Sequence, residues 1–381
     1  MKIFHFSDTH LGYSDLDVLN EENINQREAD FYDAFSQVIE QIKKIKPDYI
    51  IHTGDLFHRS SPSNRAITFA LEQFKTINAL NIPFILIAGN HSTPRTNLSS
   101  PILKIFENFE NIYVSFNQEY KKVEFKEVIF HTLPHMNDET TALSQIELCE
   151  AGINADKKNI MMMHCSVGAS YLMQEFGEWV FPREKEYIFE KMDYVALGHW
   201  HGFGQVGKHA NVYYSGSTER TSLNDKRNSK GFIEINLDDA TSSKTASLFG
   251  STDIQFKEIR IRPIIQKELD CKEYDNALID ASDTKDAIVE VRLINLTALQ
   301  SIDIQNSDIK KIFPLAMSVS VKREFKHGAN DANLADIEAL SLEEFFLEHI
   351  KEDSNEKEYD RLKGKVQELF AQYEEASDDT N

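Results

Sequence analysis

Residues 3–10 read Ile-Phe-His-Phe-Ser-Asp-Thr-His, a short apolar run that leads into an aspartate and a histidine. An apolar run of this length, bounded by polar residues, is typical of a buried strand. Four more runs of the same kind follow, each ending in polar residues or glycine: Tyr49–Thr53, Phe84–Ala88, Ile160–Met163 and Tyr194–Leu197. Together they predict a sheet of buried strands in the first two-thirds of the chain.

Helical patterns lie between these strands. The stretch from about Arg27 to Ile45 carries apolar residues at helical spacing, and Pro47 ends it. Two further helices are expected at about Ser63–Ala79 and Ser99–Phe109. Strands that alternate with helices predict an α/β fold, with a layered β-sheet core flanked by helices.

The pattern changes near Ile259, where Ile259–Pro263 predicts a strand leading out of the first domain. A second, small α/β domain is expected after it, built from a helix (about 273–281), a strand (287–293), a helix (299–312) and a strand (316–323). The predicted organisation is a first domain at 1–258, a second domain at 259–328, C-terminal helices at 329–376 and a disordered tail at 377–381.

The C-terminal segment carries much of the negative charge. The whole chain has a net charge of −21, and sixteen acidic and five basic residues between Asp331 and Asn381 contribute −11 of it. Because affinity for phosphate depends on local charge, the acidic total does not exclude a nucleic-acid substrate. Two amphipathic helices are expected here, with the apolar stripes Leu342, Phe345, Phe346, His349, Ile350 and Leu362, Val366, Leu369, Phe370, Tyr373.

The composition, 41% hydrophobic and 27% charged, is that of a soluble globular protein. The apolar runs are too short to span a membrane, and the N-terminus lacks the apolar region of a signal peptide. The three cysteines are widely spaced and are interpreted as reduced structural thiols. We therefore expect a cytoplasmic or nuclear location.

Residues of metal-ligand type follow each of the five apolar runs. They are Asp8 and His10, Asp55, Asn90 and His91, His164, and His199 with His201. Ligands of α/β sheets bind at the carboxyl ends of strands, so one sheet is expected to bring these residues together. Strand alternation would place Asp8 with His10, and His199 with His201, on one side. Carboxylate, amide and imidazole donors suit first-row divalent ions, and Asp55 could bridge two of them.

The order of these motifs resembles the calcineurin-like metallophosphoesterase superfamily. Within it, the chain is most similar to the DNA double-strand-break repair nucleases, meaning bacterial SbcD and its archaeal and eukaryotic relatives. The stretches that carry this resemblance are Phe6–Tyr13, Gln26–Glu28, Gly54–His58, Gly89–Arg95, Ala196–His201 and Ser215–Arg220. The resemblance reaches Ile259–Pro263 and is looser beyond it.

The resemblance implies two Mn²⁺ ions per chain. One ion would be held by Asp8, His10, Asp55 and His201, and the other by Asp55, Asn90, His164 and His199. His91 matches a catalytic histidine that does not bind metal, and His58 matches a second histidine near the substrate. Ser92 departs from the pattern, because an acidic residue usually follows Gly-Asn-His.

The resemblance also implies an activity and partners. It implies a double-strand exonuclease and single-strand endonuclease that processes DNA ends, forms a homodimer through 63–79 and 99–109, and docks its C-terminal helices on the coiled coil of an SMC-like ATPase (SbcC in bacteria). The residues suggested for DNA contact are Arg59, Lys208, Arg220, Lys226 and Arg227. Lys230 adds to that basic cluster, and Lys322, Arg323 and Lys326 offer another in the second domain.

Two alternatives remain at this stage. The chain could be another phosphoesterase of the same fold, such as a protein phosphatase or a cyclic-nucleotide diesterase. It could also be a scaffold whose site has decayed, although every expected ligand position holds a residue able to bind a metal.

Overall fold

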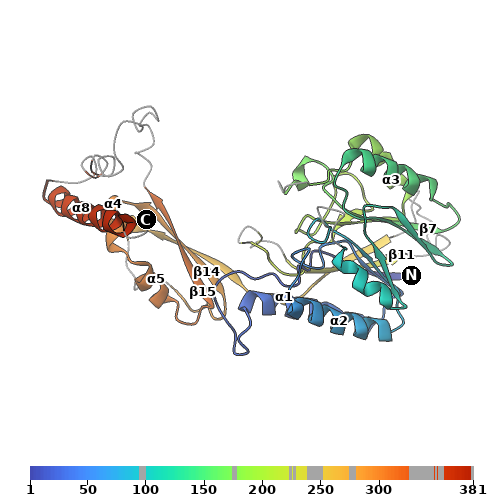
Figure 1. Cartoon of the computed structure of the whole chain (residues 1–381), viewed down its shortest axis with the longest axis horizontal. Helices are drawn as coiled ribbons and strands as arrows, with labels where there is room; N and C mark the ends of the chain where they lie inside the picture. The colour runs from blue at the N-terminus through green and yellow to red at the C-terminus, as the bar shows by residue number, and fades with distance from the viewer. Residues whose placement is uncertain are drawn as a thin grey trace. The chain divides into compact units, whose positions relative to one another are not determined.

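The computed structural model describes the chain except for residues 94–99, 174–177, 223–224, 226–228, 238–251, 274–279, 326–346, 348–349, 351–355 and 379–381. The chain divides into two compact units, Met1–Ile261 and Arg262–Asn381 (Figure 1). Lys226, Arg227, Lys326 and most of the first C-terminal stripe therefore lie outside the described residues.

Among its described residues, the first unit contains two sheets of six strands each. One has the order β12-β11-β1-β2-β3-β4 and the other β5-β6-β7-β8-β10-β9. The strands are β1 (Lys2–Phe6), β2 (Tyr49–His52), β3 (Phe84–Ile87), β4 (Ile112–Ser115), β5 (Lys121–Glu124), β6 (Val128–Leu133), β7 (Lys158–His164), β8 (Tyr194–Gly198), β9 (Gly204–Gln205), β10 (Val212–Tyr214), β11 (Gly231–Leu237) and β12 (Thr252–Glu258). The expectation of a single sheet was wrong, because the five ligand-bearing strands are shared between the two.

The two sheets pack face to face. Ile51 and Ile85 of the first sheet belong to the same buried cluster as Phe130 and Met162 of the second. Both faces of the central strands are thus buried, and this is why these strands read as continuous apolar runs rather than alternating ones.

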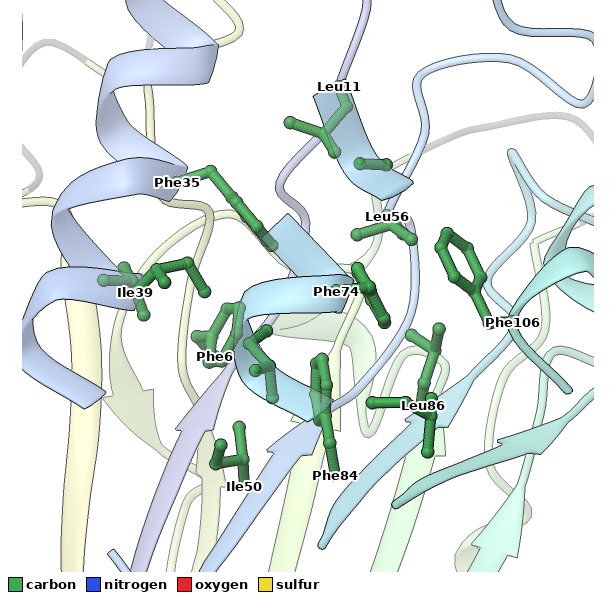
Figure 2. Close-up of a cluster of buried hydrophobic side chains, with 14 of the residues drawn as sticks. Phe6, Leu11, Phe35, Ile39, Ile50, Leu56, Phe74, Phe84, Leu86 and Phe106 are labelled. Carbon is green, nitrogen blue, oxygen red and sulfur yellow. The ribbon is translucent and has the colours of Figure 1, made fainter. Parts of the chain in front are cut away.

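Helices cover the outer faces of the sandwich. Helices α1 (Gln26–Ile45) and α2 (Asn64–Ala79) lie on one side of the strands and α3 (Glu139–Ala151) on the other (Figure 1). Figure 2 shows Phe6 and Phe84 of the first sheet pointing toward Phe35 of α1 and Phe74 of α2. The described part of the unit also contains the 3-10 segments η1 (Ile102–Asn108), η2 (Ala169–Tyr171) and η3 (Arg183–Lys191).

Local capping sets the ends of the first two helices. The Asn25 side chain accepts hydrogen bonds from the backbone N–H groups of Arg27 and Glu28 at the start of α1. Lys46 ends α1 in a left-handed conformation, directly before Pro47. The Ser63 side chain caps α2 in the same way as Asn25 caps α1. Both helices were predicted to within one residue because these signals are local.

Two other expected elements differ from the structure. The helix expected at Ser99–Phe109 is the shorter 3-10 segment η1, which follows Pro101. The segment Ile259–Pro263 is not a strand but the connection between β12 and the first strand of the second unit. Its apolar residues alternate with arginines over too few positions to distinguish a strand from an extended linker.

The second unit is built on a parallel sheet of three strands, β13 (Ile264–Asp270), β14 (Ile288–Leu296) and β15 (Ser318–Phe325). The segments η5 (Cys271–Glu273), α4 (Ala298–Asp303) and α5 (Asn306–Ile312) accompany it. The single helix expected at 299–312 was wrong, because Ile304 is extended. Arg323 of β15 donates a hydrogen bond to the Ile304 carbonyl at 2.8 Å. This long-range contact stabilises the interruption between α4 and α5. Of the helix expected at 273–281, the stretch 274–279 lies outside the described residues.

Helix α8 (Glu356–Asp378) carries the second C-terminal stripe. Its Leu362 and Val366 are buried in a small cluster with Ile350, and Leu347 and Phe370 pack against them. Leu369 of the same stripe is 58% exposed. The two stripes therefore contact each other where the structure describes them. No helix in the described part of the chain is long and apolar enough to cross a membrane.

Candidate metal centre

The carboxyl ends of the ligand-bearing strands lie at one edge of the sandwich. Strands β1, β2 and β3 are parallel neighbours, as are β7 and β8 of the other sheet. The backbone N–H of His135, after β6, donates to the carbonyl of Ala88, after β3, at 2.9 Å and so joins the two sheets at this edge. The loops that follow these strands carry the predicted ligands.

Backbone conformation in these loops is unusual. Asp8, His10, Asp55 and His199 have φ of 50°, 41°, 52° and 97°. Asp8 and His10 do lie together as expected, but strand alternation is not the cause, because Asp8, His10 and His199 lie in turns of positive φ beyond the strand ends. Such residues cost roughly 1–3 kcal/mol each and persist only where surrounding contacts fix them, as at functional sites.

Two glycines allow the loops to approach closely. A Cβ on Gly54, whose φ is +105°, would lie 2.1 Å from Nδ1 of His164. A Cβ on Gly89 would lie 2.2 Å from Oδ1 of Asp55. Neither position can hold a side chain unless a predicted ligand moves, which explains the glycine beside each ligand.

Asp8, His10 and His201 form the first cluster, and their ligand atoms lie within 4.8 Å of one another. The Nε2 atoms of His10 and His201 are 3.1 Å apart. All three residues are buried, and the Asp8 carboxylate accepts hydrogen bonds from the Ser7 hydroxyl and from the backbone N–H of His199.

Asp8, Asp55 and His164 form the second cluster. Nε2 of His164 lies 3.3 Å from Oδ2 of Asp55 and 2.9 Å from Oδ1 of Asn90. Nδ1 of His164 donates to the carbonyl of Thr53 at 2.7 Å, which turns Nε2 toward the carboxylates.

His199 lies beside the second cluster. Its ring is edge-on to that of His164, with 5.4 Å between centroids. Its Nε2 contacts Oε1 of Glu178 at 2.9 Å. The sequence analysis did not identify Glu178, because no motif or spacing marks it.

The electrostatics of the two clusters fit bound cations. Burial raises the pKa of Asp8 to about 7. Burial also opposes ionisation of Asp55, but the neighbouring His164, His91 and His10 lower the pKa of Asp55 well below its usual range. The pKa of His164, which burial alone would lower, rises to about 9 because of Asp55 and Asp8. The positive charge of protonated His164 balances the nearby carboxylates, as a bound cation would. These residues are also of the types that bind first-row divalent ions.

His91 and His58 lie at the rim of the centre. The His91 ring is 25% exposed, its Nδ1 donates to the His58 carbonyl at 2.6 Å, and its Nε2 lies 3.9 Å from Asp55. The two rings stack with 5.2 Å between centroids. Burial and the nearby His91 lower the pKa of His58 to about 4, so His58 is neutral near pH 7.

Ser92 is fully buried next to His91. Within the described residues, its hydroxyl has no hydrogen-bond partner. His91 is instead oriented by the His58 carbonyl and by its backbone N–H, which donates to Asp55 at 3.0 Å. A carboxylate at position 92 is therefore not required to hold His91 in this chain.

The basic residues suggested for DNA contact are dispersed. Arg59 is exposed next to His58, and Arg220 directly precedes Thr221, whose hydroxyl contacts His201 Nδ1 at 2.8 Å. Lys208 precedes β10, which runs parallel to β8, so it lies at the opposite end of the sheet from the ligands. In the second unit, Lys322 pairs with Glu290 and Arg323 binds Asn306 and the Ile304 carbonyl. Lys230 is buried and donates to the His201 carbonyl.

Comparison with known proteins identifies the family. Residues 1–203 of the 381-residue chain match the calcineurin-like phosphoesterase family. The chain belongs to this family. As a calcineurin-like phosphoesterase it is a metal-dependent enzyme, and its fold implies divalent metal ions at the clustered aspartates and histidines.

The similarity to known relatives extends over most of the chain. It is 28% identical to the DNA double-strand break repair protein Mre11 of Methanococcus maripaludis, over 92% of this chain and 91% of the relative. It is 29% identical to the protein of the same description from Thermoplasma acidophilum, over 71% of this chain and 69% of the relative.

Similar solved structures share less sequence identity with the chain. One is the phosphoesterase YfkN from Bacillus subtilis, with a TM-score of 0.40 and 15% identity over 67% of this chain and 90% of that one. A dimetal phosphatase from Danio rerio gives a TM-score of 0.40 and 10% identity over 61% of this chain and 91% of that one.

Proposed function

We propose that this calcineurin-like phosphoesterase is a DNA nuclease that processes the ends of double-strand breaks. The observation that carries the proposal is the similarity to Mre11 repair proteins, which spans 92% of the chain and thus includes the second unit as well as the phosphoesterase domain. A protein phosphatase or a cyclic-nucleotide diesterase is not expected to contain that second unit.

The proposed ligands divide between two ions. Asp8, His10 and His201 would hold one ion, Asn90, His164 and His199 the other, and Asp55 would bridge them. Two bound divalent ions supply an activated water and stabilise charge on the phosphoryl oxygens. We take Mn²⁺ as the ion to test first.

His91 would act on the substrate without holding metal. Its Nδ1–H is committed to the His58 carbonyl, so Nε2 is the nitrogen that can donate to a phosphoryl or leaving oxygen. Neutral His58 stacks on His91 and would keep that ring in place. Arg59, exposed next to His58, and Arg220, next to Thr221, would contact the phosphate backbone.

The domain roles and partners belong to the same proposal. The second unit would cap the DNA, a homodimer would hold two ends, and an SMC-like ATPase would bind the C-terminal helices. DNA substrates place the protein at the nucleoid or in a nucleus.

The test is digestion of DNA by the purified chain with Mn²⁺. End-labelled linear duplex and circular single-stranded DNA separate exonuclease from endonuclease activity, and a phosphopeptide tests the rival phosphatase function. We expect release of nucleotides from the linear duplex and cleavage of the circle. Turnover of the phosphopeptide with intact DNA would contradict the proposal.

Asp55→Ala provides the control variant. Because Asp55 contributes to the second cluster and also contacts His91, its loss should remove bound metal and abolish cleavage together. Elemental analysis of the variant measures the first effect. Two ions retained at full occupancy would contradict a bridging role.

A further inference from the structure

Glu178 contacts a proposed metal ligand from outside the metal centre. Nε2 of His199 lies 2.9 Å from Oε1 of Glu178, and the side chains are only 3% and 8% exposed. An ionised carboxylate can only accept hydrogen bonds, so Nε2 of His199 must be the donor. A neutral imidazole that donates through Nε2 carries its lone pair on Nδ1.

Glu178 is itself fixed by the segment that follows β7, the strand that carries His164, the other proposed histidine of this ion. Its Oε1 accepts hydrogen bonds from the Ser166 hydroxyl and from the backbone N–H of Met173 at 2.9 Å. Ser166 follows His164 by two residues, and its N–H donates to the Trp179 carbonyl at 2.9 Å. The carbonyl of Ser166 in turn accepts from the N–H of Phe181 at 2.8 Å.

These bonds form a continuous path from β7 to His199. Val180, two residues after Glu178, pairs with Ser166 as a short bridge, and the Glu178 carboxylate contacts His199. The position of one histidine is thereby tied to the strand that carries the other. Metal-binding histidines commonly donate their second ring N–H to a carboxylate, which fixes the tautomer and makes the ligand nitrogen more basic.

We infer that Glu178 is a positioning residue that holds His199 in the Nδ1-binding tautomer for the ion shared with His164. The inference rests on the proposed function, in that it takes His199 to be a metal ligand. It adds a residue that no sequence motif of the family marks in this chain.

The chain offers a matched control. Glu186 contacts Nε2 of His209 at 3.1 Å, which is the same pair of groups at a similar distance. Residue 209 lies in the turn before β10, at the end of the sheet opposite the metal centre. Glu186→Gln therefore removes a carboxylate–histidine pair without touching the centre.

Mn²⁺ binding to the full chain, measured by calorimetry and by elemental analysis, tests the inference. Glu178→Ala should weaken binding of one ion by about 10- to 100-fold, the usual effect of losing such a partner. Glu178→Gln should weaken binding of that ion less than Glu178→Ala does, because the glutamine amide oxygen still accepts a hydrogen bond. The other ion, and both ions of Glu186→Gln, should bind as in the wild type.

A double-mutant comparison separates positioning from folding. If Glu178 acts through His199, Glu178→Ala should weaken Mn²⁺ binding no further in a His199→Ala background. Wild-type affinity in both Glu178 variants, or a lowered Tm with unchanged affinity, would overturn the inference, as would an equal further loss in the His199→Ala background. A wild-type chain that binds no Mn²⁺ would overturn the proposed function itself, and the inference with it.

Discussion

At the scale of single residues, the metal centre depends on side chains that the backbone aims at one another. Left-handed turns at Asp8 and Asp55 and the absence of a side chain at Gly54 let loops from two sheets meet. A fault of about 1 Å in such a site is enough to reduce activity, so changes here should act on chemistry and metal affinity more than on folding.

His91→Ala should separate catalysis from metal binding. His91 is at the rim and its Nδ1 is bonded to the His58 carbonyl, so its removal leaves the two ligand clusters in place. We expect metal content near that of the wild type and turnover lower by about 10²–10⁴-fold, the usual contribution of a positioned acid. Loss of metal from this variant would make His91 a ligand instead.

His5 predicts a sensitivity to acid. It is fully buried between the sheets, bonded to the hydroxyls of Tyr194 and Thr53, and burial with the nearby His52 lowers its pKa to about 3. The folded pKa is below the unfolded value, so the unfolded chain binds a proton that the folded chain does not. The stability that neutral His5 provides is therefore complete above about pH 6.5 and is lost as the pH falls toward 3.

Urea unfolding in the presence of a chelator measures this effect. His5→Gln should reduce the loss of unfolding free energy between pH 6.5 and 5 by up to about 1.4 kcal/mol per pH unit. His52 has a similarly lowered pKa and leaves a residual slope in the variant. Equal slopes in the two proteins would show that His5 titrates in the folded state.

At the scale of elements, part of the apolar surface of α2 and η1 packs in the core and is therefore not free to bind a partner. Phe74, Leu103 and Phe106 are fully buried against the first sheet, whereas Ile67, Leu71 and Ile102 are half-buried. Only the second set is left for the proposed dimer interface, which is smaller than the sequence pattern suggested.

Sedimentation tests the dimer interface. Ile67→Lys places a charge among the half-buried residues of α2, and we expect it to shift the protein from dimer to monomer at micromolar concentration. Glu72→Lys, on an exposed position of the same helix, is the control and should leave the dimer intact. A wild-type chain that remains monomeric with and without DNA would exclude this interface.

At the scale of the whole molecule, the two units have separate cores. Within the second unit, residues of the sheet and of α5 share one buried cluster. Residues of α8 form a separate, small cluster with Ile350. Besides that cluster, an exposed ion pair joins Arg361 of α8 to Asp303 at 3.6 Å, and a pair of this kind stabilises little.

Truncation after Gly328 should therefore spare the nuclease. We expect Mn²⁺-dependent cleavage of simple DNA to continue, because every proposed ligand lies in the first unit. Binding of an SMC-like ATPase should be lost, since the exposed Leu369 and its neighbours are removed. Retained ATPase binding, measured by co-sedimentation, would show that the C-terminal helices serve only their own unit.

The sequence by itself indicated the proposed metal-ligand residues, and it determined the strands before them and α1 and α2 with their caps. Each of these is encoded by neighbours in the chain: an apolar run before a polar group, or Asn25 and Ser63 before a helical stripe. Tertiary structure decided how strands far apart in sequence divide into two sheets, and it broke the helix at Ile304 through Arg323. It also decided the remote position of Lys208 and the contact of Glu178 with His199. A local pattern reports local conformation, whereas these contacts join residues whose proximity is set only by strand pairing and packing of the whole chain.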